Sequence, residues 1–272
     1  MTRLKQDDVA ALAAELEEYN AELVGMTGCS LREIAVNAAG KGDREDDARK
    51  LSVAVIPMTC GQGIIESFAE SVAGIVSYLG FKTVITKSRD VGGVAEAVQN
   101  GSEILFMADD DCFIALNLRT GKVSDNGDAT GRGYVAGLLQ MCGGLKGKNV
   151  LVIGAGPVGT SAALALVRVG AEVSIYDIDP PVSQRLSGKI IEEGYTAKIA
   201  ADLESALAEH AILVDACPGE GLIMPRHISE QTMIAAPGIP LGVQAAGLAR
   251  LSNRLLHDPL QIGVATMVFD VL

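Results

Sequence analysis

The residues most clearly arranged for chemistry are three glycines that separate a short apolar run from a helical pattern. Residues Asn149 to Ile153 are rich in β-branched side chains, and the run Gly154-Ala155-Gly156-Pro157-Val158-Gly159 follows them. In a βαβ unit the first glycine permits a tight turn, the second lets backbone approach a pyrophosphate, and the third lets the helix pack on the strand. These six residues are therefore predicted to bind a dinucleotide at a helix N-terminus. The alternative is a glycine-rich turn in a fold that has lost its nucleotide.

An acid after the next strand-like run indicates which dinucleotide is bound. Residues Glu172 to Tyr176 lead into Asp177, at the distance from Gly154 expected for a carboxylate that binds ribose hydroxyls. The following residues, 178–181, include no Arg or Lys that could receive a 2′-phosphate. The predicted cofactor is therefore NAD. Later strand ends add three residues to the predicted cofactor site: Cys217, Pro218 and Pro237.

Polar residues also follow the predicted strands of the first half, at the end of the sheet where open α/β folds bind ligands. The run Asp109-Asp110-Asp111 could hold a cationic amine, and Asp109, the nearest to its strand, is the favoured member. The alternative interpretation is that these three residues form a solvated turn. The run Thr59-Cys60-Gly61-Gln62-Gly63 could cradle a carboxylate or phosphate, or form an ordinary βα turn. Cys60 is more typical of a small packed thiol than of a nucleophile.

Histidine offers few candidates for acid–base chemistry. The chain has three, of which His210 and His227 are expected at the surface. His257 lies beside Asp258 after a predicted strand, so it is retained as a candidate, and Asp258 is a candidate partner for a substrate amine. An acid-lined cleft between two α/β halves suits an amine substrate, and hydride transfer from a carbon that bears nitrogen would be the natural chemistry.

These residues must be positioned by alternating strands and helices, so the predicted fold class is α/β. A helical N-terminal segment, residues 1–50, precedes a small parallel α/β region, residues 51–142. Both belong to a predicted substrate-binding domain, residues 1–147. Residues 148–272 are predicted to form a C-terminal Rossmann domain with a doubly wound sheet that binds NAD.

Periodicity and capping signals predict individual helices. Thr2 to Val24 carries an apolar stripe, and Ser30 with Glu33 forms a capping box for a second helix. The stripe is a surface that a second copy of the chain could cover, as in a homodimer. Four further predictions are a helix over Ile64 to Leu79, a glycine-rich loop over Asn126 to Gly133, a helix over Tyr134 to Met141 and a terminal helix over Val264 to Leu272.

Composition limits the classes of function. The 272 residues carry a net charge of −12, which repels nucleic-acid phosphates. The five cysteines form no paired metal-ligand pattern, so we expect no metal site and interpret them as reduced thiols of a cytoplasmic protein. No signal-peptide pattern and no apolar run of bilayer length is found in the sequence. The expected partner is a small-molecule amino-acid substrate, with no nucleic acid and no membrane.

Several segments together resemble the pyrrolysine synthase family. They occur in order over essentially the whole length, and the most specific are 59–65 and 107–110. The matching segments are Val55 to Ile65, Phe68 to Ser71, Leu105 to Asp110, Val150 to Gly159, Ala236 to Pro240 and Pro259 to Met267, together with Leu4 and Thr27-Gly28.

The resemblance implies a reaction and a set of roles. The family oxidises L-lysine-Nε-(3R)-methyl-D-ornithine at the ornithine carbon that bears the terminal amine, with NAD+ as hydride acceptor. Ammonia is lost, and the ornithine α-amine condenses with dehydration to close the ring of L-pyrrolysine. By position, the resemblance implies a substrate site of Leu4, Thr59, Cys60, Phe68, Asp109, Asn126 and Asp258, with Cys60, Asp109 and Asp258 as the catalytic set.

Two positions depart from the family pattern. Cys60 stands where the family has serine, and Asp258 stands where it has glutamate. A thiol donates a weaker hydrogen bond than a hydroxyl, and Asp is one methylene shorter, so substrate affinity is affected more than reaction type. Two other interpretations stay open: a dehydrogenase of a free diamine or amino acid, and a non-catalytic NAD-binding sensor.

Overall fold

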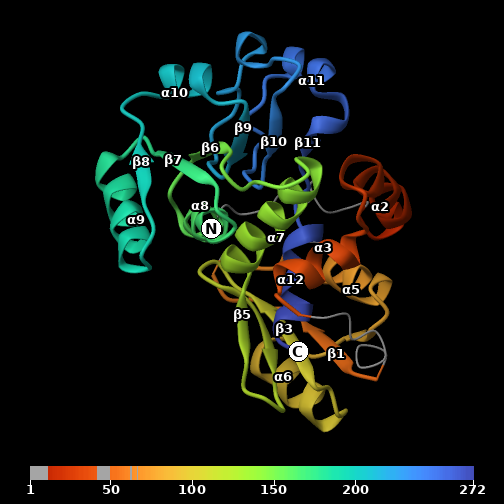
Figure 1. Ribbon diagram of the computed structural model, residues 1–272. Coiled ribbons are helices and arrows are strands. Elements are labelled where there is room, and N and C mark those ends of the chain that lie inside the picture. Colours follow the sequence, from red (N-terminus) through yellow and green to blue (C-terminus); the bar gives the residue numbers. More distant parts are fainter. Residues whose placement is uncertain (1–11, 42–49, 62, 66) are drawn as a thin grey trace. The chain divides into compact units, whose positions relative to one another are not determined.

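The computed structural model describes residues 12–41, 50–61, 63–65 and 67–272, and Figure 1 labels its elements. The chain forms two compact units. Unit 1 comprises the described residues up to Glu22, followed by Ser30–Ala129 and Pro259–Leu272, and unit 2 comprises Leu23–Cys29 and Thr130–Asp258. The predicted boundary near residue 147 differs from this division, which falls inside a helix at residue 129. Leu4, a predicted substrate residue, lies outside the described residues.

A five-stranded sheet forms the centre of unit 1. Its order is β2-β1-β3-β4-β5, with β1 parallel to β2 and β3 and with β4 and β5 added in antiparallel pairs. The strands are β1 (Ser52–Ile56), β2 (Lys82–Ile85), β3 (Ile104–Ala108), β4 (Phe113–Asn117) and β5 (Val123–Asp125). The helices wholly within this unit are α3 (Leu31–Ala38), α5 (Phe68–Tyr78), α6 (Asp90–Gln99) and α12 (Gln261–Asp270). The predicted small parallel region is confirmed in β1, β2 and β3.

The terminal helix α12 is part of unit 1, although the sequence prediction assigned it to the Rossmann domain. Its residues are buried from Gln261 through Phe269. It packs on α3 and α5, and Figure 1 shows this dark-blue helix among elements of the first half of the chain. Phe269 meets Phe81 edge-on, with ring centroids 5.6 Å apart. A helix that is apolar on every face needs cover on every side, and the helices and sheet of unit 1 supply it.

Among the residues that the structure describes, no helix combines the length and apolarity needed to cross a bilayer.

Unit 2 is a six-stranded parallel sheet with the strand order of dinucleotide-binding domains. The order β11-β10-β9-β6-β7-β8 corresponds to the 6-5-4-1-2-3 arrangement, in which the chain starts at the centre and winds outward twice. The strands are β6 (Asn149–Ile153), β7 (Glu172–Tyr176), β8 (Ala197–Ile199), β9 (Ile212–Asp215), β10 (Met233–Ala235) and β11 (Leu255–Leu256). The helices are α8 (Pro157–Arg168), α9 (Pro180–Glu192), α10 (Leu203–Glu209) and α11 (Ala245–Leu251). The predicted Rossmann fold is confirmed.

The capping box predicted for the second helix is also confirmed. The Ser30 N–H donates to Oε2 of Glu33 at 2.7 Å, and the Glu33 N–H donates to Oγ of Ser30 at 3.3 Å. The preceding helix, α2 (Leu12–Thr27), carries the predicted apolar stripe, but Leu16 and Leu23 are buried within the single chain. The stripe therefore gives no reason to expect a homodimer.

The helix after β1 starts later than its periodicity predicts. It begins at Phe68 instead of Ile64. Ser67, immediately before it, has a φ of 66°, which is a left-handed conformation that residues with side chains rarely adopt. This bend closes the loop that begins at Thr59 and sets Phe68 at the start of α5.

The glycine-rich segment predicted as a loop is the first half of helix α7 (Asn126–Met141). Gly131 shows why a glycine is needed in this segment. A Cβ there would lie 2.6 Å from the Val158 carbonyl oxygen and 2.6 Å from Cβ of Ser161. Glycine lets α7 approach the start of α8 more closely than any side chain would permit. The prediction was wrong because glycine that serves close helix packing looks the same in sequence as glycine that serves a turn.

We expect Gly131→Ala to destabilise the protein by about 1–3 kcal/mol, because the added methyl group forces α7 away from α8. The matched control is Gly188→Ala in α9, where an added Cβ would have no atom of the described chain within 4 Å. That change should be neutral or stabilising by up to about 1 kcal/mol, since alanine is the better helix former. Urea unfolding measures both, and equal effects of the two changes would contradict the packing explanation.

Candidate functional site

The turn between β6 and α8 has the backbone geometry that a dinucleotide requires. Gly154 has a φ of 89°, and a Cβ there would lie 3.0 Å from the Ala216 carbonyl oxygen. A Cβ on Gly159 would lie 1.9 Å from the carbonyl oxygen of Gly154, so the helix packs directly on the end of the strand. At Gly156, by contrast, nothing in the described chain lies within 4 Å of a Cβ. Gly154 therefore forms the turn and Gly159 the close packing of helix on strand, while the backbone at Gly156 is open; phosphate binding there stays a prediction.

The other residues of the predicted run complete the start of α8. Pro157 is the first residue of the helix, where the missing N–H costs nothing. Ala155 is buried and Val158 is half-buried. The helix N-terminus and the open Gly156 backbone together fit a pyrophosphate group.

Asp177 is bound to this turn by its own carboxylate. Its Oδ2 accepts the Ala155 N–H at 2.7 Å, and its Oδ1 accepts the Asp179 N–H at 2.9 Å. The prediction foresaw a ribose-binding acid and missed this structural function. The carboxylate joins the end of β7 to the glycine turn, and these two hydrogen bonds hold its position.

One of the cofactor residues predicted after β9 and β10, Cys217, contacts a buried acid that sequence reasoning missed. Asp215 ends β9 and is completely buried. The Cys217 thiol donates to Oδ1 of Asp215 at 3.1 Å, and burial together with the Asp215 carboxylate raises the pKa of Cys217 to about 12. Cys217 is therefore a thiol rather than a nucleophilic thiolate at neutral pH. Pro218 is exposed in the same loop, and Pro237 is half-buried after β10. An acid directly after the apolar run Ile-Leu-Val was the available signal.

Asp258 is buried and anchored by a tyrosine of α7. The Tyr134 hydroxyl donates to the Asp258 carbonyl at 2.7 Å and accepts the Asp258 N–H at 2.8 Å. Burial, and then the negative charge of Asp258, raises the pKa of Tyr134 well above its ordinary value. Beside it, Nδ1 of His257 lies 2.7 Å from the Ala236 carbonyl oxygen. A carbonyl only accepts, so Nδ1 carries the hydrogen in this contact and Nε2 is the acceptor of the neutral ring.

The two histidines predicted at the surface both have partners. His210 lies 2.8 Å from the Ala206 carbonyl oxygen and 3.0 Å from the Ser174 hydroxyl. The His227 side chain is only 4% exposed. His210 is half-buried, whereas the prediction was wrong for His227, whose side chain is enclosed because it binds Glu204 of α10.

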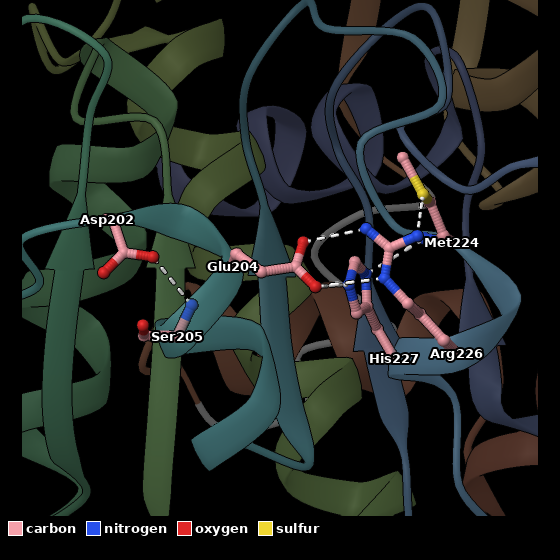
Figure 2. Close-up of polar contacts among 6 residues, drawn as sticks. All are labelled: Asp202, Glu204, Ser205, Met224, Arg226 and His227. Atoms are coloured by element: carbon pink, nitrogen blue, oxygen red, sulfur yellow. Dashed lines mark hydrogen bonds and ion pairs between the residues drawn. The ribbon is translucent and has the colours of Figure 1, made fainter.

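His227 belongs to an ion-pair cluster that holds the long loop after β9. Figure 2 shows the Glu204 carboxylate, at the start of α10, facing both Arg226 and His227. Arg226 donates to both carboxylate oxygens, at 3.0 and 2.9 Å, and Nε2 of His227 lies 3.1 Å from one of them. Hydrogen bonds from Arg226 and then His227 lower the pKa of Glu204 to about 2. The cluster fixes the far end of the loop that begins at Cys217.

In unit 1, the loop after β1 is held by Asp90, the first residue of α6. The Thr59 N–H donates to Oδ1 of Asp90 at 2.7 Å, and the Thr59 hydroxyl donates to Oδ2 at 2.5 Å. These two bonds lower the pKa of Asp90. Both donors of Thr59 are thus bound to Asp90. Cys60 is exposed, and the Asp110 carboxylate lies against Gly61, where a Cβ would be 2.1 Å from Oδ2.

Asp109 stands exposed at the end of β3 with a fixed negative charge. Its Oδ1 accepts the N–H groups of Cys112 at 2.7 Å and of Asp111 at 2.9 Å. These hydrogen bonds lower the pKa of Asp109. The turn interpretation is therefore confirmed for this residue through Oδ1, and binding of a substrate amine by its charge stays a prediction.

Two further predicted substrate residues are positioned by neighbours in unit 1. Phe68 is half-buried and meets Phe113 edge-on, with ring centroids 5.3 Å apart. Nδ2 of Asn126 lies 3.4 Å from the sulfur of Met267 on α12. Unit 1 thus contains Thr59, Cys60, Phe68, Asp109 and Asn126, whereas Asp258 and the whole predicted cofactor set belong to unit 2.

Tyr134→Phe should lower the free energy of unfolding by about 1–3 kcal/mol, because it removes two hydrogen bonds from a buried backbone segment. The matched control, Tyr195→Phe, removes the hydroxyl of an exposed tyrosine and should change stability by less than about 0.5 kcal/mol. Denaturant unfolding of both variants tests this, and an unaffected Tyr134→Phe protein would show that the hydroxyl does not anchor Asp258.

The Glu204 cluster should make a pH-dependent contribution to stability. Its folded-state pKa of about 2 lies below the ordinary value of 4.5. The contribution is therefore fully present above pH 4.5 and is lost as the pH falls toward 2. Thermal unfolding should show a lower midpoint for Glu204→Gln than for the unmodified chain at pH 7, and the difference should narrow toward pH 2. A difference that stays constant with pH would show that the carboxylate charge is not responsible.

Comparison with known proteins agrees with this division of the chain. Residues 8–124 match the family model of the pyrrolysine biosynthesis protein PylD, N-terminal domain, and residues 127–235 match that of the alanine dehydrogenase/PNT C-terminal domain. Quinate dehydrogenase from Corynebacterium glutamicum, solved in complex with NAD, is similar in structure with a TM-score of 0.56 and 16% identity. The similarity covers 81% of this chain and 92% of that one, and it shows the fold alone.

Two curated relatives match along their full length. Pyrrolysine synthase of Methanosarcina barkeri is 32% identical over 272 residues, which cover 100% of this chain and 98% of the relative. Pyrrolysine synthase of Methanosarcina acetivorans is 30% identical over 272 residues, which cover 100% of both chains. Because this identity extends through both units, the chain belongs to the pyrrolysine synthase family.

Proposed function

We propose that this chain is an NAD-dependent pyrrolysine synthase. It oxidises the terminal amine carbon of L-lysine-Nε-(3R)-methyl-D-ornithine to an imine, takes up one water as ammonia leaves, and closes the pyrroline ring of L-pyrrolysine with loss of one water, so the net change is the loss of two hydrogens and one ammonia. The observation that carries the proposal is the glycine turn with its bound Asp177, in a chain of this family.

The C-terminal edge of the unit 2 sheet is the proposed cofactor site. The first N–H groups of α8 would bind the pyrophosphate next to Gly156. Asp177 would accept hydrogen bonds from ribose hydroxyls, because each carboxylate oxygen has a second acceptor position beyond its bond to backbone. Ile178, which is 89% exposed, offers apolar surface next to it. When bound, NAD+ supplies the hydride acceptor.

The proposed substrate site uses the charge and apolar surface of unit 1, which corresponds to the predicted N-terminal substrate-binding domain. Asp109 would bind a substrate ammonium group through the oxygen that the turn does not use. Phe68 would cover the aliphatic chain, and the exposed Cys60 would make a polar contact. Asn126 also belongs to this proposed set, as does Leu4.

Asp258 is the proposed contribution of unit 2 to substrate binding. Its backbone is fixed at both its N–H and its carbonyl by Tyr134, so the carboxylate starts from a defined position. An acid there would hold a second amine of the substrate. The cytoplasm is the proposed location, since the five cysteines are free thiols.

Asp109→Asn should raise KM for the lysyl-ornithine substrate about 10- to 100-fold with a smaller effect on kcat, because it removes a charge-assisted hydrogen bond to an ammonium group. The matched control is Asp111→Asn, which removes the same charge from the same exposed turn and is outside the proposed set. Steady-state kinetics measures both, and equal effects would show that the turn acts only through its general negative potential.

Cys60→Ser restores the hydroxyl that the family pattern has at this position. We expect it to retain activity with an equal or lower KM, whereas Cys60→Ala should raise KM, since a hydroxyl donates a stronger hydrogen bond than a thiol and alanine donates none. Complete loss of activity in Cys60→Ser would contradict a simple polar contact and indicate covalent chemistry by the thiol.

The reaction itself is tested by mixing the purified protein with NAD+ and L-lysine-Nε-(3R)-methyl-D-ornithine. The expected result is NADH absorbance together with a product whose mass is lower by two hydrogens and one ammonia. Bound NAD with no turnover of this substrate would contradict the proposal. Comparable turnover of free ornithine or lysine would instead indicate a diamine or amino-acid dehydrogenase, and tight NAD binding without turnover of any amine would indicate a sensor.

A further inference from the structure

The first residue of α6 has a backbone conformation that is uncommon for a residue with a side chain. Asp90 has a φ of 51°, in the left-handed region that favours glycine. Such a conformation persists where the surrounding structure imposes it, and it occurs preferentially where a protein has a use for it. The hydrogen bonds of Asp90 show what that use is.

Three hydrogen bonds join Asp90 to the loop after β1. The Asp90 N–H donates to the Pro57 carbonyl oxygen at 3.1 Å. Its carboxylate accepts the Thr59 N–H through Oδ1 at 2.7 Å and the Thr59 hydroxyl through Oδ2 at 2.5 Å. One residue of α6 therefore fixes both Pro57 and Thr59, directly before Cys60.

The start of α6 is itself fixed against the end of β1. A Cβ on Gly93 would lie 2.6 Å from Cγ2 of Ile56 and 2.7 Å from the Ser88 carbonyl oxygen, so only glycine lets the helix lie this close. Gly93 is about one helical turn from Asp90. The position of the Asp90 carboxylate is therefore set by the packing of α6, and the loop conforms to it.

Beyond Thr59 the loop reaches the turn that follows β3. Gly61 has a φ of 67°, and a Cβ there would lie 2.1 Å from Oδ2 of Asp110. Asp110 is the neighbour of Asp109, the residue proposed to bind a substrate ammonium group. The loop that Asp90 holds thus adjoins the proposed amine site.

The bonds to Asp90 also decide what Thr59 can offer a substrate. They lower the pKa of Asp90, so the carboxylate is ionised at neutral pH and only accepts. The hydrogen of the Thr59 hydroxyl therefore points to Asp90, and the Thr59 N–H is bound to the same carboxylate. Only the lone pairs of the hydroxyl oxygen remain for a ligand. Thr59 can accept a hydrogen bond from a substrate N–H, but it has no donor left for a substrate carboxylate or phosphate.

We propose that Asp90 is a positioning residue for substrate binding, which fixes the loop before Cys60 and makes Thr59 a hydrogen-bond acceptor for a substrate N–H group. Asp90 does not touch the substrate and acts through Thr59. The proposal rests on the proposed function, because the substrate of that reaction carries the amines and the amide N–H that such an acceptor would bind.

The test is steady-state kinetics of Asp90→Asn with NAD+ and L-lysine-Nε-(3R)-methyl-D-ornithine. An amide has one oxygen where the carboxylate has two, so one donor of Thr59 loses its acceptor and faces the amide NH₂ group instead. We expect KM to rise about tenfold while kcat changes less than about twofold. If Thr59 donated to a substrate carboxylate, the same change would free its hydroxyl hydrogen and lower KM, and that result would overturn the proposal.

A second variant shows whether Asp90 acts through Thr59. Thr59→Val keeps the N–H that donates to Asp90 and removes the hydroxyl, so KM should rise by a similar factor. In the double variant, Asp90→Asn should add less than about twofold to the KM of Thr59→Val, since the two changes remove the same interaction. Additive effects, or an unchanged KM in Thr59→Val, would overturn the proposal.

The matched control is Glu96→Gln on the same helix. The Glu96 carboxylate also accepts two backbone N–H groups, from Lys87 at 3.0 Å and Ser88 at 2.8 Å, but these belong to the loop after β2. Glu96→Gln removes the same charge from α6 and should leave KM unchanged. An equal rise of KM in this variant would show that the charge or the integrity of α6 is responsible, against a specific role of Asp90.

The two proposals fail in different ways. If the unmodified chain forms no NADH from this substrate, the proposed function is wrong, and the substrate role of Asp90 is overturned with it. If the unmodified chain is active and a folded Asp90→Asn protein has the same KM, only the role of Asp90 is overturned. Circular dichroism and thermal unfolding establish that each variant is folded, and Thr59→Val provides the decisive comparison if Asp90→Asn does not fold.

Discussion

The predicted nucleotide-binding turn of unit 2 depends on close backbone packing between Gly154, the first glycine of the motif, and Gly159, the third. A side chain on Gly159 would place its Cβ 1.9 Å from the Gly154 carbonyl oxygen, so only glycine lets α8 begin this close to the end of β6. The open Gly156 backbone and the N–H groups of α8 are consequences of this contact. Asp177 secures the turn through its bond to the Ala155 N–H.

Unit 1 depends on a different kind of contact, between segments that are far apart in the chain. α12 follows the entire dinucleotide-binding sheet in sequence but packs on α3 and α5 of the first half. The apolar surface of α12 is covered only when the chain returns to unit 1. The substrate-site candidates on this unit include Asn126, whose amide contacts Met267 of α12. Their positions therefore depend on residues at the C-terminus.

Sequence reasoning succeeded where a local pattern has one physical solution. The glycines of the turn after β6 and the Ser30–Glu33 capping box both specify backbone geometry within a few residues. Sequence reasoning failed where the structure is decided by a contact with residues distant in the sequence. Gly131 was interpreted as part of a loop because its neighbour, the start of α8, is brought to it by the fold. The assignment of α12 to the wrong domain has the same origin, since helical periodicity predicts an apolar face and does not identify what covers it.

The aspartates at the strand ends show that the chemistry of a side chain depends on its surroundings as well as on its residue type. Asp109 is exposed, and backbone N–H groups stabilise its charge. Asp177 has both oxygens bound to the backbone and keeps only its outer acceptor positions for a ligand. Asp215 is enclosed in apolar packing that opposes ionisation. One residue type thus has three environments: an exposed charge held by a turn, a carboxylate bound to backbone at both oxygens, and a buried group whose ionisation is opposed by burial. Only the fold determines which aspartate has which environment.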